Sequence, residues 1–266
     1  MLIQVLLAIV FAVSITAQQN STNVTVADVA RAFTAAKIVP DVLPTFNPSS
    51  LLDVVFLDNM TGMSVDVTPG INLTEQQSAQ RPQFFLVSND TSLAGQTFVL
   101  VMVDPDAPTP QIRHLLAPGL MANGSLATGA TLVNNTPAIS EYISPAPLAG
   151  SGPHRYTMVL YIQPSNFTTA VSSVVNSSTP ITNFNVSLFA QELGLGSPLA
   201  GNFFWTGPNA SSTNSTGTNS TSNATSSGSS PASSNTTSAS LGNEDLLFTA
   251  TAFASVMFGV SVMSLV

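Results

Sequence analysis

The chain has 266 residues, with five basic and thirteen acidic side chains and a formal net charge of −8. So few cations cannot neutralise a row of phosphates, which argues against nucleic-acid binding and against a polybasic contact with an anionic membrane. The absence of cysteine excludes thiol nucleophiles, thiolate metal sites and disulfides, and it indicates a domain large enough to be stable without cross-links.

The amino-terminal segment, residues 1–17, carries no charged side chain and is apolar almost throughout. It is short for a membrane span and ends in small residues, a pattern typical of a secretory signal peptide. We therefore expect cleavage near Ala17 and a secreted protein.

The folded part is predicted to be one domain over residues 24–205. Residues 26–39 place apolar side chains at helical spacing before Pro40, and they predict one amphipathic helix. Residues 185–193, which precede Gly194, predict a second helix.

Four segments between these helices have the composition of strands: they are short, rich in β-branched or aromatic residues, and bounded by Gly, Pro, Asn or Asp. The two most apolar segments, residues 97–103 and 156–162, indicate strands that are covered on both faces of the sheet. No long helix alternates with them, which argues against a parallel α/β sheet. We therefore predict a mostly β fold, an antiparallel β-sandwich with a few short peripheral helices. The four predicted strands are residues 51–57, 83–87, 97–103 and 156–162.

Residues 206–240 consist mostly of Ser, Thr, Asn and Gly, with no charged or aromatic side chain. Such a segment cannot bury enough apolar surface to offset its ordering entropy, so we expect a disordered, glycosylated stalk. The chain contains many Asn-x-Ser/Thr acceptor triplets for N-glycosylation. The candidate glycosylation sites are Asn59, Asn72, Asn89, Asn123, Asn166, Asn176, Asn185, Asn209 and Asn214.

The carboxyl-terminal segment, residues 241–266, is a short polar spacer followed by an apolar run with no basic residue after it. This pattern is typical of a signal for glycosylphosphatidylinositol (GPI) attachment, and a tail-anchored membrane span is the alternative. Asn235 and Ser238 are candidate attachment residues. The expected location is therefore the outer face of the plasma membrane or the cell wall, reached by secretion and held by a GPI anchor.

Two acids and two histidines carry the candidate chemistry. Asp104 and Asp106 stand in the sequence DPDAP, directly after the strand predicted at residues 97–103. They either cap a turn that ends the strand or project their carboxylates into a site at its mouth. His114 and His154, the only histidines, lie at the edges of apolar segments, where each could also be a hydrogen-bonded structural residue.

No enzyme signature accompanies these residues. The sequence contains no G-x-S-x-G nucleophile elbow, and its two neighbouring acids are poorly spaced to flank a sugar bond. It also lacks an H-x-x-x-H or other clustered metal-ligand pattern. We therefore predict a protein that is not an enzyme and that uses no metal or cofactor.

The order of the motifs resembles the phosphatidylethanolamine-binding protein family. DPDAP after a strand and GPHRY at the start of a later strand are similar to the two signature regions of that family, and GNFF follows near the end. The similarity extends over residues 38–205. The chain is accordingly identified as a secreted, GPI-anchored member of the fungal type.

The resemblance implies a β-sandwich with a small cavity for phosphate, acetate or a phospholipid head group. We expect Asp106 to orient a histidine ring and to favour its protonated form, which donates to the anion together with a tyrosine hydroxyl. The segment around His114 departs from the aromatic-rich pattern of the family, so one wall of the pocket is shorter or rebuilt. The implied ligand-binding residues are Asp104, Asp106, His114, His154 and Tyr156, with Pro108 and Pro145 at the rim.

These expectations lead to one predicted function and two alternatives. The predicted function is an extracellular, surface-tethered protein that binds a small anion, either phosphate or a phospholipid head group. The first alternative is inhibition of a secreted serine carboxypeptidase, because some members of the family inhibit such enzymes. The second is a structural cell-surface glycoprotein. The expected partners are the anion, the outer membrane leaflet through the lipid anchor and, under the first alternative, a secreted protease, but no nucleic acid.

Overall fold

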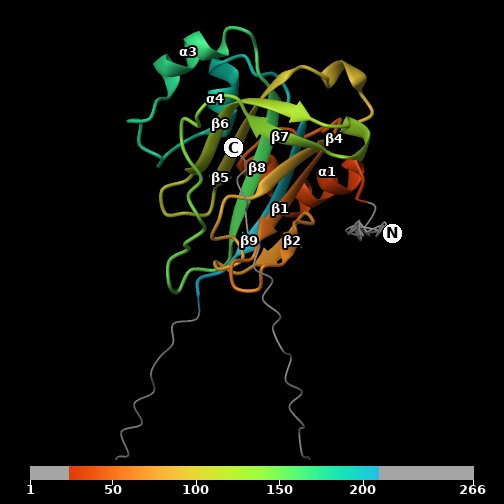
Figure 1. Ribbon diagram of the computed structural model, residues 1–266. Coiled ribbons are helices and arrows are strands. Elements are labelled where there is room, and N and C mark those ends of the chain that lie inside the picture. Colours follow the sequence, from red (N-terminus) through yellow and green to blue (C-terminus); the bar gives the residue numbers. More distant parts are fainter. Residues whose placement is uncertain (1–23, 210–266) are drawn as a thin grey trace, which may run out of the picture. The chain divides into compact units, whose positions relative to one another are not determined.

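The computed structural model describes residues 24–209, which form a nine-stranded sheet with short helices around it (Figure 1). The predicted signal peptide, nearly all of the predicted stalk and the predicted GPI signal lie outside the described residues, as do Asn214, Asn235 and Ser238. No helix within residues 24–209 is both long enough and apolar enough to cross a bilayer.

The sheet has the strand order β2-β1-β4-β7-β6-β5-β8-β9-β3. Its neighbouring strands are antiparallel, except that β3 runs parallel to β9. The predicted fold class, mostly β with a few short helices, is therefore confirmed. The strands are β1 (Leu51–Leu57), β2 (Ser64–Asp66), β3 (Ile71–Leu73), β4 (Gln83–Val87), β5 (Thr97–Asp104), β6 (Ile112–Asn123), β7 (Ala130–Asn134), β8 (His154–Ile162) and β9 (Ala200–Thr206).

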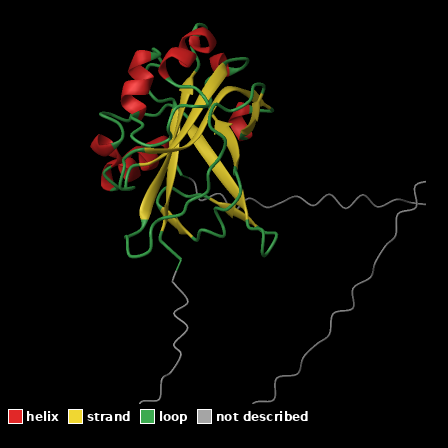
Figure 2. Cartoon of the chain, turned by 90° about the vertical axis from the view of Figure 1, so that its left-hand side faces the viewer, coloured by secondary structure: helices red, strands yellow, loops and turns green. Residues whose placement is uncertain are grey.

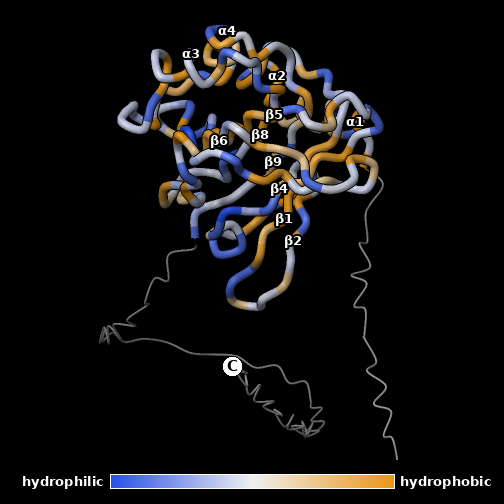
Figure 3. The backbone as a smooth tube through the Cα atoms, turned by 45° about the horizontal axis from the view of Figure 1, so that its top comes forward, coloured by the Kyte–Doolittle hydropathy of each residue, from blue (hydrophilic) through white to orange (hydrophobic). Residues whose placement is uncertain are grey.

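Alternation along the central strands divides the hydrophobic interior into two cores. In β5, Val99, Val101 and Val103 pack against the helices, in what we call the helix-side core. The intervening residues, including Leu100 and Met102, face the inside of the curled sheet, in what we call the inner core. Because successive side chains point to opposite faces of a strand, a continuous apolar run is the expected sequence of such a doubly covered strand. Figure 2 shows the helices outside the curled sheet, and Figure 3 shows hydrophobic colour concentrated along the strands.

The curl of the sheet is fixed by a buried asparagine on β9. Nδ2 of Asn202 donates to the carbonyl oxygens of Leu52, on β1, and Val67 at 3.0 and 2.9 Å. Oδ1 of Asn202 accepts from the backbone N–H of Phe203 at 2.8 Å. One side chain thus joins β9 to backbone near the opposite edge of the sheet, which closes the inner core.

The helices are α1 (Val26–Ala35), α2 (Ile38–Asp41), α3 (Phe167–Val174) and α4 (Val186–Glu192). The prediction of one continuous helix over residues 26–39 is wrong in its last four residues. Lys37 has a left-handed backbone conformation with φ of 56°, which ends α1, and Pro40 lies inside the short α2 instead of closing the first helix. The predicted second helix is confirmed as α4, which Asn185 caps by accepting from the backbone N–H of Leu188.

Candidate functional site

The site is built where β5 ends and β8 begins. These strands are antiparallel neighbours, with Val103 opposite Thr157, so the end of one lies beside the start of the other. Met102 and Tyr156 both belong to the inner core. By alternation, Asp104 and His154 face the same side as these residues.

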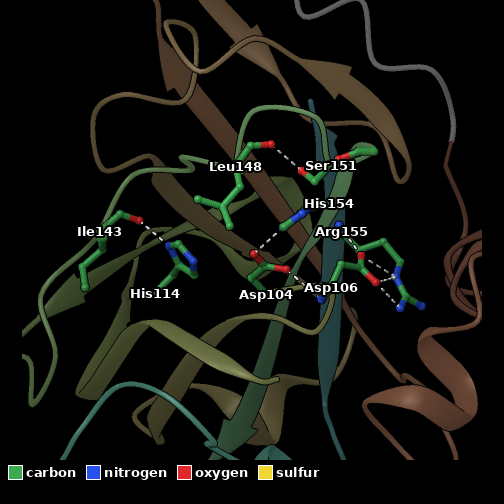
Figure 4. Close-up of polar contacts among 9 residues, drawn as sticks. Asp104, Asp106, His114, Ile143, Leu148, Ser151, His154 and Arg155 are labelled. Carbon is green, nitrogen blue, oxygen red and sulfur yellow. Dashed lines mark hydrogen bonds and ion pairs between the residues drawn. The ribbon is translucent and has the colours of Figure 1, made fainter. Parts of the chain in front are cut away.

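Asp104 and His154 form the central contact of the site (Figure 4). Oδ2 of Asp104 lies 2.8 Å from Nδ1 of His154, and the two residues are only 3% and 5% exposed. The other oxygen, Oδ1, accepts from the backbone N–H of Asp106 at 2.8 Å. Asp104 therefore caps the turn and also orients the imidazole ring of His154. Both interpretations of the DPDAP motif, a capped turn and a carboxylate directed into a site, apply to this residue. Because Asp104 occupies Nδ1, the other ring nitrogen, Nε2, is left for a ligand.

His114 joins this pair through an irregularity in β6. The register of β5 with β6 shifts between the pairs Met102–Leu115 and Val103–Arg113, which makes His114 the extra residue of a β-bulge. The bulge turns His114 toward the inner core, where its ring meets the ring of Tyr156 edge-on at a centroid distance of 5.1 Å.

The protonation of His114 differs from the expected imidazolium. Nδ1 lies 2.8 Å from the carbonyl oxygen of Ile143, so Nδ1 donates (Figure 4). Burial lowers the pKa of His114 below its usual value, and it outweighs the hydrogen bond to Ile143 and the charge of Asp104, which act in the opposite direction. The neutral ring then presents Nε2 as a hydrogen-bond acceptor. The lowered pKa therefore disfavours a protonated ring at His114.

Tyr156 supplies a hydroxyl group to the same buried space. The residue is 1% exposed, and its ring stacks on that of Phe204 at a centroid distance of 5.4 Å. Burial raises the pKa of Tyr156, against the effect of a hydrogen bond with the backbone of Ala146, so the hydroxyl keeps its proton and can donate. We call Asp104, His114, His154 and Tyr156 the imidazole cluster.

The prediction that Asp106 orients a histidine ring is wrong, because Asp106 contacts Arg155 instead. It accepts four hydrogen bonds from Arg155, one from the backbone N–H at 2.7 Å and three from the guanidinium, the shortest at 2.6 Å. Burial would raise the pKa of Asp106, but the hydrogen bonds and charge of Arg155 outweigh it and hold that pKa below its usual value. The guanidinium also donates to Asp41 and to the carbonyl oxygen of Ala36, each at 2.8 Å. Through Arg155, Asp106 therefore links the turn that follows β5 to α1 and α2.

Arg155 is the residue of this region that the sequence interpretation missed. It follows His154 directly in β8, so alternation points it toward the helix side while the histidine points inward. An arginine between this histidine and the strand predicted at residues 156–162 was the available signal, because such a charge needs a partner when it is buried.

The segment of residues 141–152 passes beside the imidazole cluster. It contains Ile143, which is 40% exposed, and Leu148, which is 62% exposed. In Figure 4 the side chain of Leu148 points toward the space between His114 and Asp104. Of the two predicted rim residues, Pro145 is buried in this segment and Pro108 is exposed.

Two surface pockets lie on the helix side of the sheet. One, of about 390 Å³, is lined by Asp41, Arg155 and Phe184 among others, and the other, of about 370 Å³, is lined by Arg113, Phe184 and residues of α3 and α4. Neither pocket is lined by a member of the imidazole cluster. The cluster is thus a buried group of polar side chains under the segment of residues 141–152, separate from both pockets.

Apart from Asn134, whose acceptor triplet lies at a partly buried position, the candidate glycosylation asparagines within the described residues are exposed. An attached glycan needs that exposure, because it is bulky and hydrated. These asparagines are Asn59, Asn72, Asn89, Asn123, Asn166, Asn176, Asn185 and Asn209.

Comparison with known proteins gives one family and several relatives. Residues 55–204 match the family model described as phosphatidylethanolamine-binding protein. The chain is 31% identical over 179 residues to a 26 kDa secreted antigen of Toxocara canis, a match that covers 65% of the chain and 62% of the antigen. It is 29% identical over 204 residues to the carboxypeptidase Y inhibitor of Saccharomyces cerevisiae, covering 63% of the chain and 90% of the inhibitor.

Solved structures share the fold. The crystal structure of carboxypeptidase Y inhibitor complexed with the cognate proteinase matches with a TM-score of 0.54 at 27% identity, over 68% of this chain and 96% of that one. A phosphatidylethanolamine-binding protein from Plasmodium vivax matches with a TM-score of 0.52 at 18% identity, over 67% of this chain and 97% of that one.

Proposed function

The chain belongs to the phosphatidylethanolamine-binding protein family, and from this premise we propose that its imidazole cluster binds a small anion, either phosphate or the phosphate of a phospholipid head group. The observation that carries the proposal is the 2.8 Å contact of Asp104 with Nδ1 of His154, on the buried face that also holds His114 and Tyr156. The contact leaves Nε2 of His154 available to the ligand.

The hydrogen-bonding groups of the cluster define the kind of anion that fits. The Tyr156 hydroxyl donates, whereas the neutral ring of His114 offers an acceptor at Nε2. A singly protonated phosphate or phosphate monoester matches both, since its P–OH group donates and its other oxygens accept, whereas the phosphodiester of a lipid head group has no P–OH and matches only the donors. Protonation of either the phosphate or an imidazole ring adds a donor to the contact, so mildly acidic conditions favour binding.

The test is calorimetric titration with methyl phosphate between about pH 5.5 and about pH 8, the range over which imidazole changes charge. We expect the affinity to fall as pH rises, and Asp104→Asn to weaken binding about ten-fold or more, because it replaces a charge-assisted contact with a neutral one. The control is Asp90→Asn, which removes a carboxylate from an exposed turn outside the imidazole cluster. Equal affinity of the wild type and Asp104→Asn, or equal loss in both variants, would contradict the proposal.

We further propose that the protein acts outside the cell, attached to the surface through a GPI anchor. The exposure of the eight candidate asparagines within residues 24–209 supports this location, and so does the similarity to an antigen described as secreted. Two treatments of the natively expressed protein test it. Peptide N-glycosidase should lower its apparent mass, and phosphatidylinositol-specific phospholipase C should release it from intact cells. Absence of both effects would refute an extracellular, lipid-anchored form.

Inhibition of a serine carboxypeptidase is the second candidate function. It is supported by the similarity to the yeast carboxypeptidase Y inhibitor over nearly all of that protein's length and by the shared fold. Peptide hydrolysis by carboxypeptidase Y, measured with increasing amounts of the protein, tests this directly. Saturating inhibition at stoichiometric concentration would support it, and unchanged hydrolysis at a large excess would exclude it for that enzyme.

A further inference from the structure

Arg113 is a buried cation with an unused donor. It precedes His114 on β6 but points to the helix side, and it is 1% exposed. Nε donates to Oγ of Ser140 at 2.6 Å, and Nη2 donates to the carbonyl oxygen of Thr179 at 3.1 Å. Nη1 is also buried, yet within residues 24–209 it has no hydrogen-bond partner.

The charge of Arg113 is likewise unmatched within the described part of the chain. No carboxylate there forms an ion pair with it, whereas the neighbouring buried arginine, Arg155, pairs with both Asp106 and Asp41. The ring of Phe184 lies 5.1 Å from Cζ of Arg113 and offers a cation–π contact, but it accepts no N–H bond at Nη1. A guanidinium stays charged even when buried, so an unmatched one is a costly feature of a stable fold.

A structural role accounts for only part of this residue. The bonds to Ser140 and Thr179 tie two segments to β6, and neutral hydrogen-bonding side chains could do the same. They leave the positive charge and Nη1 without a counterpart. Buried polar groups that find no partner in the protein need a separate explanation, and a bound ion is one.

Arg113 also lines the pocket of about 370 Å³, whose other lining residues belong to α3, to α4 and to the segment between them. Much of the remaining wall is apolar, with Val174 and Val175 on one side and Leu188 and Phe189 on another. Glu192 also lines the pocket and is exposed at its rim. The pocket thus combines one buried cation with apolar walls and a negative charge near the solvent.

We propose that this pocket binds a small monocarboxylate with an apolar body, whose carboxylate pairs with Nη1 of Arg113. The apolar walls match a hydrocarbon group, and a planar carboxylate matches the edge of a guanidinium. The negative charge of Glu192 disfavours more highly charged anions such as phosphate. Nη1 has almost no accessible surface in the structure, so contact with the carboxylate requires a small shift of the guanidinium or of the pocket wall, and the charge-assisted bond offsets the desolvation of both groups.

This site is distinct from the imidazole cluster. Arg113 and His114 are consecutive residues, but the bulge in β6 directs one to the helix side and the other to the inner core. The two sites can therefore be tested separately with two probes, isovalerate for the pocket and methyl phosphate for the cluster.

The experiment titrates isovalerate into the protein and follows binding by calorimetry and by amide chemical shifts. Arg113→Met, which keeps the long side chain but removes the charge, should weaken isovalerate binding about ten-fold or more. Leu188→Trp tests the pocket without touching Arg113, because position 188 is half exposed and a larger side chain there obstructs the opening. It should weaken isovalerate binding and leave methyl phosphate binding unchanged.

Two further variants complete the test. Glu192→Gln should tighten isovalerate binding, because it removes the negative charge at the rim. Asp104→Asn, in the imidazole cluster, should leave isovalerate binding unchanged. Absence of isovalerate binding to the wild type would overturn the proposal, and so would binding that neither Arg113→Met nor Leu188→Trp weakens.

Discussion

The carboxylate of Asp104 and the imidazole of His154 meet at 2.8 Å, although fifty residues separate them in the sequence. The same carboxylate also accepts from the backbone N–H of Asp106 and so holds the turn that follows β5. Position and orientation of the His154 ring therefore depend on the shape of that turn.

Asp106 shapes the site through Arg155. Replacing Asp106 by asparagine removes the negative charge of the carboxylate that accepts three hydrogen bonds from the Arg155 guanidinium. Asp41 is then the one carboxylate that still pairs with Arg155 within the described residues. We expect Asp106→Asn to lower the free energy of unfolding by about 1 to 3 kcal/mol, measured by urea denaturation near neutral pH. Asp90→Asn, in an exposed turn, is the control and should change it by less than about 0.5 kcal/mol. Equal stability of the Asp106 variant and the wild type would show that the pair with Arg155 is energetically neutral.

His114 should make stability depend on pH. Its pKa is lowered in the folded protein by burial, so below about pH 6.5, the ordinary value for histidine, the unfolded chain binds more protons than the folded one. The contribution of His114 is therefore present above that pH and is lost as the pH falls toward the folded-state pKa. The facing groups are the Ile143 carbonyl, Asp104, His154 and Tyr156.

Urea denaturation at about pH 7.5 and at about pH 5.5 measures this effect. The wild type should be less stable at the lower pH, and His114→Gln should reduce the difference, because glutamine can still donate to Ile143 but does not titrate. An unchanged pH dependence in the variant would assign the effect to other groups. Asp106 contributes in a separate, more acidic range, because its pKa is lowered from 3.8 and its stabilisation is lost only as the pH falls through that lowered value.

Tyr156 is expected to affect binding more than stability. Tyr156→Phe removes the hydroxyl and keeps the stacking on Phe204. The free energy of unfolding should change by less than about 1.5 kcal/mol, whereas the affinity for methyl phosphate should fall about ten-fold, because a hydrogen bond to a charged ligand is lost. Full affinity in this variant would place the anion out of reach of the hydroxyl.

Asn202 should matter for the fold alone. Asn202→Ala deletes the two hydrogen bonds to Leu52 and Val67 and leaves buried carbonyl oxygens without partners. Thermal or urea denaturation should show a loss of about 2 to 4 kcal/mol. In unglycosylated protein, Asn72→Ala on the exposed side of β3 is the matched control and should have little effect. Similar losses in both variants would argue against a special role of Asn202 in closing the sheet.

Much of the fold could be predicted because its central strands have a clear composition. Segments 51–57 and 83–87 were predicted with the bounds of β1 and β4, and β5 and β8 are longer than predicted by one and two residues. By contrast, β6 was missed, although it carries His114. Pro118 and Gly119 interrupt its apolar pattern, and Gly119 is required there because a Cβ at that position would meet Thr136. The short β2 and β3 have too few residues to show an alternation.

Four of the predicted site residues, Asp104, His114, His154 and Tyr156, lie together in the structure, but the sequence did not show how they pair. The sequence showed two acids after the strand predicted at residues 97–103 and a histidine before the strand predicted at residues 156–162, yet it could not show which acid meets the histidine. Alternation decides this: Asp104 and His154 face inward, and Asp106, beyond the end of the strand, meets Arg155 instead. The neutral state of His114 depends on burial and on a bulge, and neither is visible in the sequence. The charge of Arg113, which is unmatched within residues 24–209, is likewise a property of the folded chain.

The central claim is that one anion contacts the two imidazole rings, and it can be tested directly because the chain contains only two histidines. A ¹⁵N-labelled protein without a polyhistidine tag should give two sets of imidazole signals, which His114→Gln assigns. Methyl phosphate should shift the Nε2 signals of both rings along one saturating curve, and Asp104→Asn should abolish that response in the same concentration range. Imidazole signals that stay unchanged up to millimolar methyl phosphate would contradict the assignment of this cluster as the anion site.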